Sequence, residues 1–286
     1  MTRHLRRCVP FVLLLALAAA PGFAELDFGM GLGIGVATYP DGFGGFETWQ
    51  SLSLKPDLAF GKFGIGLDVQ LNYRFTGGAG NEFVIRADDW VPDDFQDFLK
   101  IYLPKIMYIR WDEKGAPLYA KLGSIDDGTL GNGFIMGGYA NTLFLPDERH
   151  FGLAFDLDGA LFKFPYVGLE TFVGDLAEFD VVGARLFVRP LIWLGVPIIK
   201  DLQIGGTVAM DLKPYLHGDP LDTEMVMVYG ADARLPILSM KILSLAVFAD
   251  VASIEGESYG GMVGFGGRLL SFLTYSAQLR VLGPDF

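Results

Sequence analysis

The stretch from Gln50 to Phe75 constrains the fold of this chain most, because it has the pattern of a complete β-hairpin. Apolar residues occupy alternate positions in both arms, and Gly61-Lys62 separates the arms as a two-residue loop. A loop of this length with glycine first suits a type II′ turn, which fixes the register of the two arms. That register places the apolar side chains on one face and the polar ones on the other. The expected apolar pairs are Phe60 with Phe63, Leu58 with Ile65, Leu54 with Val69 and Leu52 with Leu71; the expected polar pairs are Lys55 with Asp68 and Ser53 with Gln70.

Alternation with a period of two residues recurs along the chain and predicts thirteen strands, most of them close to the length of a tilted membrane strand. The first expected strand, 26–36, alternates apolar residues with four glycines, which leaves one face bare, as suits the lumen of a barrel. Pro56 cannot donate a ladder hydrogen bond to its expected partner Leu67, so a β-bulge is expected there. Beyond the hairpin, the other expected strands are 106–112, 118–124, 151–158, 166–174, 180–189, 202–213, 225–235, 243–253, 260–269 and 273–281.

Composition narrows the fold class further. The chain has 51% hydrophobic residues and a net charge of -12, and its mean hydropathy of +0.36 is high for a soluble domain. After residue 24 no apolar run approaches the roughly 18 to 20 residues that a membrane helix needs. Two classes fit these facts: a soluble β fold with a large core, or a β-barrel in an outer membrane.

Residues 1–24 have the three parts of a secretory signal peptide: basic residues, the apolar run from Phe11 to Ala20, and small residues before Glu25. Cys8, the only cysteine, lies in this segment, so the mature chain would have no disulfide. Cleavage would also remove Arg3, Arg6 and Arg7 and take the net charge from -12 to about -15. So acidic a surface argues against a nucleic-acid partner.

These features predict an all-β fold: an antiparallel up-and-down transmembrane β-barrel of about 12–14 strands in residues 25–286, embedded in outer-membrane lipid. If the short connections are periplasmic, the two longest ones, Gly77–Lys105 and Ile125–His150, both fall on the outer side. Bacterial single-chain barrels have even strand numbers. With thirteen strands, either the count is off by one or the chain is part of a longer barrel.

The segment from Ile125 to His150 is long, glycine-rich and apolar enough to be ordered. It either folds into the lumen as a constriction or plug, or forms an ordered surface loop. For a constriction, the candidate residues are Asp126, Asp127, Asn132, Tyr139 and Asn141.

Three short segments in this region carry a family resemblance: Pro117–Ala120, Gly123–Asp126 and Gly133–Met136. With these segments the chain resembles uncharacterised, porin-like outer-membrane β-barrel proteins of double-membraned bacteria. The resemblance covers about 40 residues and implies a barrel without a known substrate.

Charged residues on the polar phase of the strands are candidates for the lining of the lumen, because rings of such groups set the selectivity of pores. Both signs are present, so the alternative is that they neutralise one another in a closed interior. The candidates are Asp68, Arg74, Asp156, Asp158, Glu170, Arg185, Arg189, Asp211, Asp232, Arg234 and Arg268, with Lys213, Asp250 and Arg280 in the same phase.

Other chemistry has little support in the sequence. Asp126, Asp127 and Asn132 lack the closing glutamate of a calcium loop, so no metal or other cofactor is expected. His150 and His217 come without a nucleophile motif, which makes a membrane-embedded hydrolase a weak alternative. Asp93 or Asp94 is expected to cap a short amphipathic helix.

Two functions follow as the main hypotheses. The favoured one is a channel or transporter for small solutes, not an enzyme, with the Ile125–His150 segment narrowing the lumen. The other is a closed barrel with a structural, assembly or surface-binding role. A soluble exported β protein is a third hypothesis. The solute and the oligomeric state do not follow from the sequence.

Overall fold

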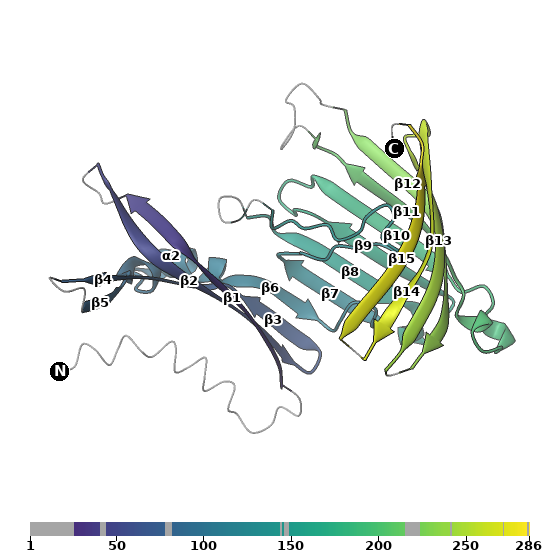
Figure 1. Ribbon diagram of the computed structural model, residues 1–286, viewed down its shortest axis with the longest axis horizontal. Helices are drawn as coiled ribbons and strands as arrows, with labels where there is room; N and C mark the ends of the chain where they lie inside the picture. Colours follow the sequence, from purple (N-terminus) through teal and green to yellow (C-terminus); the bar gives the residue numbers. More distant parts are fainter. Residues whose placement is uncertain are drawn as a thin grey trace. The chain divides into compact units, whose positions relative to one another are not determined.

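The computed structural model describes residues 26–40, 44–77, 82–143, 145, 149–214, 224–240, 242–270, 272–284 and 286. The expected signal peptide and His217 lie outside these residues. The chain is all-β, as predicted, with 58% of its residues in strands. None of the helices in the described ranges is long and apolar enough to cross a membrane. Contacts divide the chain into two compact units, residues 1–110 and 111–286, whose strands are labelled in Figure 1.

The first unit is an antiparallel sheet in which β2 pairs with β1 on one side and with both β3 and β4 on the other. Beyond β3 lies β6, which runs to the boundary of the unit, and beyond β4 lies β5. The bounds are β1 (Leu26–Pro40), β2 (Phe46–Phe60), β3 (Phe63–Leu67), β4 (Val69–Thr76), β5 (Glu82–Ile85) and β6 (Ile106–Trp111).

The hairpin register predicted from the sequence is confirmed on both sides of an interruption. Phe60 pairs with Phe63 and Leu58 with Ile65 in β3, and Leu54 pairs with Val69 and Leu52 with Leu71 in β4. Gly61 has a φ of 61°, as the first position of a type II′ turn requires. The β-bulge expected at Pro56 is absent, since the register is the same on both sides of it; the partner strand is instead broken between β3 and β4. At the break, the N–H of Asp68 donates to the carbonyl of Lys105 at 2.8 Å.

The structure has fifteen strands among the described residues, against about 12–14 predicted from the sequence. The break at Asp68 divides one expected strand into β3 and β4, and β5 forms within the expected loop 77–105. Since β3 and β4 continue each other beside β2, and β5 and β6 both lie on their far side, the fifteen strands occupy thirteen positions. Local alternation does not reveal β5, because it has only four residues.

The segment between β5 and β6 folds over the polar side of the first unit. Asn72, which is almost fully buried, donates from Nδ2 to Asp89 Oδ2 and to Tyr39 Oη, both at 2.9 Å. The Nζ of Lys105 donates to the Asp89 carbonyl at 2.9 Å, and burial lowers the pKa of this amine, with Asp89 opposing the shift. The helix α2 (Phe95–Tyr102) follows, and the capping prediction is confirmed, since Asp94 accepts from the Asp97 N–H at 2.8 Å.

The second unit is an antiparallel meander in which each strand pairs with the next along the chain. The strand order does not return to its start among the described residues, so the sheet is not closed. The bounds are β7 (Leu118–Gly123), β8 (Gly152–Asp158), β9 (Val167–Val173), β10 (Val181–Val188), β11 (Gln203–Asp211), β12 (Val226–Ser239), β13 (Ser244–Ile254), β14 (Ser258–Leu269) and β15 (Leu273–Leu282).

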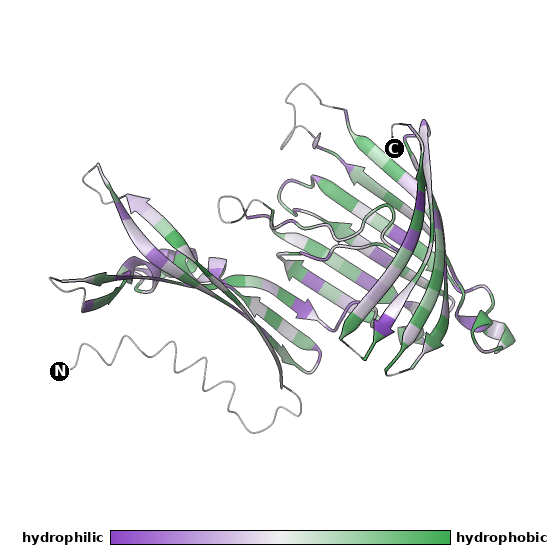
Figure 2. Ribbon diagram, viewed as in Figure 1, coloured by the Kyte–Doolittle hydropathy of each residue, from purple (hydrophilic) through white to green (hydrophobic). Residues whose placement is uncertain are grey.

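Burial in the second unit is inverted relative to a soluble protein. On β10, Arg185 is only 1% exposed, whereas its neighbour Leu186 is 57% exposed. On β13, Asp250 is buried while Val251 is 61% exposed. Figure 2 shows the polar and apolar residues alternating along these strands. Charged side chains are rarely buried in soluble proteins, so this sheet turns its polar face inward and its apolar face outward.

The hairpin of the first unit has the same polarity, although less strongly. Ile65, Val69 and Leu71 are half-buried and not packed in a core. The opposite phase contains the buried Ser51 and Asn72.

Glycines on the polar face make room for large side chains, and this can be tested at Gly168. A Cβ at Gly168 would lie 2.2 Å from the ring of Phe187, which is itself buried. We therefore expect Gly168→Ala to lower the free energy of unfolding by about 1–3 kcal/mol through overpacking. The matched control is Gly206→Ala, where the nearest atom is 3.9 Å away, and a change within about 1 kcal/mol, in the stabilising direction, is expected there. Urea titration of both variants checks this, and equal effects would contradict it.

Candidate functional site

The segment between β7 and β8 packs on the polar face of the second unit, as Figure 1 shows. Three of its apolar side chains, Ile125, Leu130 and Met136, are buried and belong to one cluster with Tyr119 on β7 and Phe172 on β9. The segment is therefore an ordered part of the unit and is seated against the sheet by its own small core.

Asn141 holds the two ends of the segment together. Its side chain is 4% exposed; Oδ1 accepts from the Ile125 N–H at 2.8 Å, and Nδ2 donates to the carbonyls of Gly174 at 2.9 Å and Gly123 at 3.2 Å. Between these ends, Gly128 and Tyr139 form an isolated antiparallel bridge with hydrogen bonds of 2.9 Å in both directions. Residues 129–138 therefore form a loop whose two ends are joined by this bridge.

Arg185 is the centre of the charged network under the segment. Its Nε and Nη2 donate to the two carboxylate oxygens of Asp232 at 2.8 and 2.6 Å, and Nη1 donates to Glu170 at 2.9 Å. The other oxygen of Glu170 accepts from the N–H of Gly131 at 2.8 Å. Such a bidentate pair is rigid. The network therefore holds the strands β9, β10 and β12 and the tip of the segment, at Gly131, in fixed positions relative to one another.

Asn132, beside Gly131, makes the second contact of the tip with the sheet. Its Nδ2 donates to both carboxylate oxygens of Asp250, at 3.1 and 3.3 Å, and to the Ala233 carbonyl at 3.4 Å. Arg234 donates to its Oδ1 at 3.5 Å. The structure therefore brings together Asn132, Glu170, Arg185, Asp232 and Arg234, all of them candidates from the sequence.

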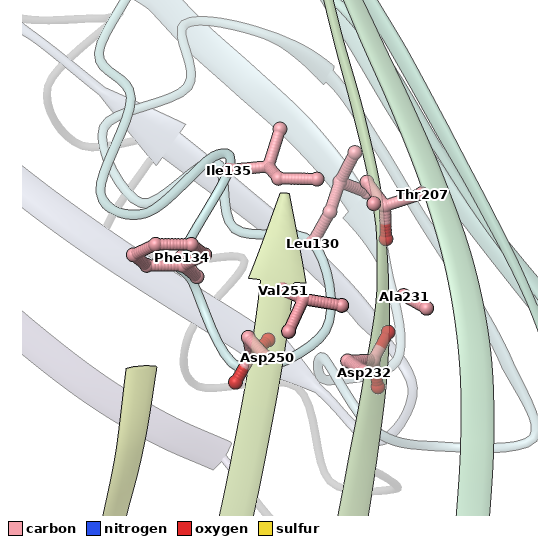
Figure 3. Close-up of a pocket in the computed structure, with 9 residues that line it drawn as sticks. Leu130, Phe134, Ile135, Thr207, Ala231, Asp232, Asp250 and Val251 are labelled. Carbon is pink, nitrogen blue, oxygen red and sulfur yellow. The ribbon is translucent and has the colours of Figure 1, made fainter. Parts of the chain in front are cut away.

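A small cavity opens between the tip and the strands, with a volume of about 10 Å³, which is room for about one water molecule. In Figure 3, Leu130, Phe134 and Ile135 reach it from the segment, and the carboxylates of Asp232 and Asp250 lie on the strands opposite. Its walls thus combine apolar side chains with carboxylates. No group of His, Cys, Asp or Glu able to hold a metal ion occurs among the residues that the structure describes.

Asp126 and Asp127 do not reach the cavity. Their side chains are mostly exposed, and they form ion pairs with Lys121 on β7 at 3.0 and 3.3 Å. Lys121 is buried and is absent from the candidates derived from the sequence. It could have been found, since it lies on the same phase of its strand as Tyr119, opposite Leu118, Ala120 and Leu122.

Two further candidate carboxylates are ion-paired at the other end of the strands. Asp156 is buried beside Lys114, whose Nζ lies 3.2 Å away. Asp158 binds Arg189 through two hydrogen bonds of 2.6 and 3.1 Å. This agrees with the alternative that opposite charges neutralise one another in the interior.

The remaining candidates of the second unit lie apart from this network. Asp211 accepts from the Lys213 N–H at 3.0 Å at the end of β11. Arg268 is exposed near the end of β14, where its backbone N–H donates to Ser244. These two positions are therefore not brought to the site.

The candidates of the first unit form their own pairs. Asp68 accepts from Ser53 Oγ at 2.8 Å and lies 3.6 Å from Lys55, its predicted partner. Arg74 binds Glu47 at 2.9 Å, and its guanidinium lies 4.2 Å from the centre of the Trp49 ring.

Tyr139 and His150 lie near the end of the strands at which the segment joins β7 and β8. The Tyr139 ring packs edge-on against Phe172, with centroids 4.9 Å apart. Burial, assisted by the charge of Asp180, raises the pKa of its phenol to about 12, so the phenol is neutral at physiological pH. His150 Nδ1 lies 2.9 Å from Asp175 Oδ2. A His–Asp pair supplies a base but no nucleophile.

No protein-family model matches the chain, and no curated protein matches it.

Proposed function

We propose that this protein is an outer-membrane β-barrel that passes small solutes, and that the segment 125–150 narrows its lumen. The observation that carries the proposal is the inverted burial of the second unit, where Arg185, Asp232 and Asp250 are buried and Leu186 and Val251 are exposed. An outward apolar face and a polar interior are the pattern of a transmembrane barrel.

The proposal requires closure of the sheet. The end strands β1 and β15 each pair with a single neighbour among the described strands, and closure would join them directly or through further strands. Unpaired strand edges cannot face hydrocarbon, because their N–H and C=O groups would have no partners there. The resemblance to porin-like outer-membrane proteins supports the same assignment.

The second candidate is a closed barrel with a structural, assembly or surface-binding role. It is favoured by the pairing of interior charges, such as Arg185 with Asp232 and Arg189 with Asp158, and by the seating of the segment on the sheet. The two candidates differ in whether a continuous aqueous path passes the segment.

Purified protein reconstituted in a planar bilayer tests the proposal. We expect discrete conductance steps, and lipid vesicles that contain the protein should swell in small sugars but not in large ones. Absence of both conductance and solute flux would contradict the channel. A protein that stays in buffer without detergent would contradict the membrane assignment and favour a soluble exported β protein.

A further inference from the structure

Four connections at one end of the second unit expose large apolar side chains and form an apolar rim. Because the strands alternate in direction, the connections β8–β9, β10–β11, β12–β13 and β14–β15 share an end. Neighbouring connections are also hydrogen-bonded to each other: the N–H of Arg189 donates to the Tyr166 carbonyl, and that of Leu270 to the Ile242 carbonyl, both at 2.8 Å. We call this end the apolar rim.

The longest of these connections, β10–β11, is the most exposed. It contains two short 3₁₀ helices, Ile192–Leu194 and Ile199–Asp201. Every residue from 193 to 200 is exposed, and Trp193 is 69% exposed. The other connections also expose large apolar side chains, those of Phe162, Ile242 and Phe272, and Phe272 is 80% exposed. So large an exposed apolar surface marks an interaction site.

Charge distinguishes the two ends of the unit. Lys163, Lys200 and Arg268 are exposed at the apolar rim. Of the acids at this end, Glu113 before β7 is exposed, Asp158 is bonded to Arg189, and Asp201 is partly buried. The opposite end carries exposed acids, which include Asp126, Glu178, Glu255 and Glu257. The apolar rim therefore combines aromatic and aliphatic side chains with exposed basic groups.

We infer that the apolar rim is immersed in the headgroup region of a phospholipid leaflet and prefers anionic headgroups. Aromatic rings are favoured at the membrane interface, and lysine and arginine reach from there to phosphate groups. The inference rests on the proposed function, because it requires that the protein resides in a membrane. It adds two statements: that this end of the strands contacts phospholipid headgroups, and that it prefers anionic headgroups.

Single-cysteine labelling tests the immersion. The only cysteine in the sequence, Cys8, lies in the expected signal peptide, so a mature chain with Trp193→Cys or Phe272→Cys takes one fluorescent label at the apolar rim. The matched control is Glu257→Cys, at the opposite end of the strands. All three labelled proteins are reconstituted in phosphatidylethanolamine vesicles that contain either phosphatidylglycerol or phosphatidylcholine.

We expect labels at positions 193 and 272 to be quenched by spin-labelled lipid headgroups and protected from aqueous iodide. The label at 257 should show the reverse. If position 193 is as open to iodide as position 257 in protein that floats with the vesicles, the inference is wrong while the membrane assignment stands. Protection from iodide without quenching by lipid would indicate a protein partner or a second copy and would also overturn it. Failure to float with vesicles would instead overturn the proposed function.

A separate experiment measures the preference for anionic lipid. Around the unaltered protein, spin-labelled phosphatidylglycerol should be enriched over phosphatidylcholine at low salt. Lys163→Gln with Lys200→Gln should reduce the enrichment, by up to about fivefold per lysine. Glu255→Gln with Glu257→Gln, at the opposite end, should leave it unchanged. Equal amounts of the two lipids around the unaltered protein would contradict the charge preference.

Discussion

Replacing Arg185 with alanine is expected to lower the free energy of unfolding by about 3–5 kcal/mol, because the change leaves buried carboxylates without their counter-charge. Asp232 loses both of its short hydrogen bonds to the guanidinium, and Glu170 loses the one at 2.9 Å. Both partners are too enclosed for water to replace the lost bonds, since their side chains are 4% and 19% exposed. Urea titration of the protein in lipid vesicles, followed by tryptophan fluorescence, measures the loss.

Lys213→Ala is the matched control for this prediction. Lys213 and Glu178 also form a short ion pair, at 2.7 Å, but their side chains are 30% and 50% exposed. Exposed pairs contribute about 1 kcal/mol or less. If the two variants lose the same stability, or if Arg185→Ala loses less than about 1 kcal/mol, the buried network is not the centre of the second unit.

Excising residues 129–138 is expected to raise the single-channel conductance severalfold, because the excised residues include Leu130, Asn132 and Met136, which seat the segment on the polar face. Gly128 and Tyr139 are already paired as an antiparallel bridge, so an Asn-Gly turn can join them without altering their positions. The shortened chain keeps Ile125 and Asn141, which hold the ends of the segment. Planar-bilayer recordings of the two proteins make the comparison.

Replacement of Glu255-Gly256-Glu257 with Asn-Gly controls for the effect of shortening a connection. This turn joins β13 and β14 at the same end as the segment, and we expect it to leave the conductance unchanged. If the shortened chain forms a steady open pore, the second candidate, a closed barrel without a channel, is wrong. A shortened chain that floats with vesicles but does not conduct would contradict the channel and favour the structural role.

The sequence by itself determined the strands of the hairpin, their pairing and the phase of each side chain. Leu58 pairs with Ile65 and Leu52 with Leu71 as predicted, because alternation and a two-residue turn are local properties that leave one compatible register. The same alternation identified Glu170, Arg185 and Asp232 as residues of the polar face. The composition also predicted the all-β class.

Only the tertiary structure decided which of those charges meet and which strands are interrupted. Arg185 and Asp232 are 47 residues apart, and Asn132 reaches Asp250 across 118, so their contacts depend on the order of the strands and the seating of the segment. The break at Asp68 and the short strand β5 likewise depend on the segment between β5 and β6, through Lys105 and Arg86. The local sequence pattern determines the face of the sheet on which a side chain lies. The partner of that side chain depends on the pairing of strands that are far apart in the sequence, so no single stretch of sequence predicts it.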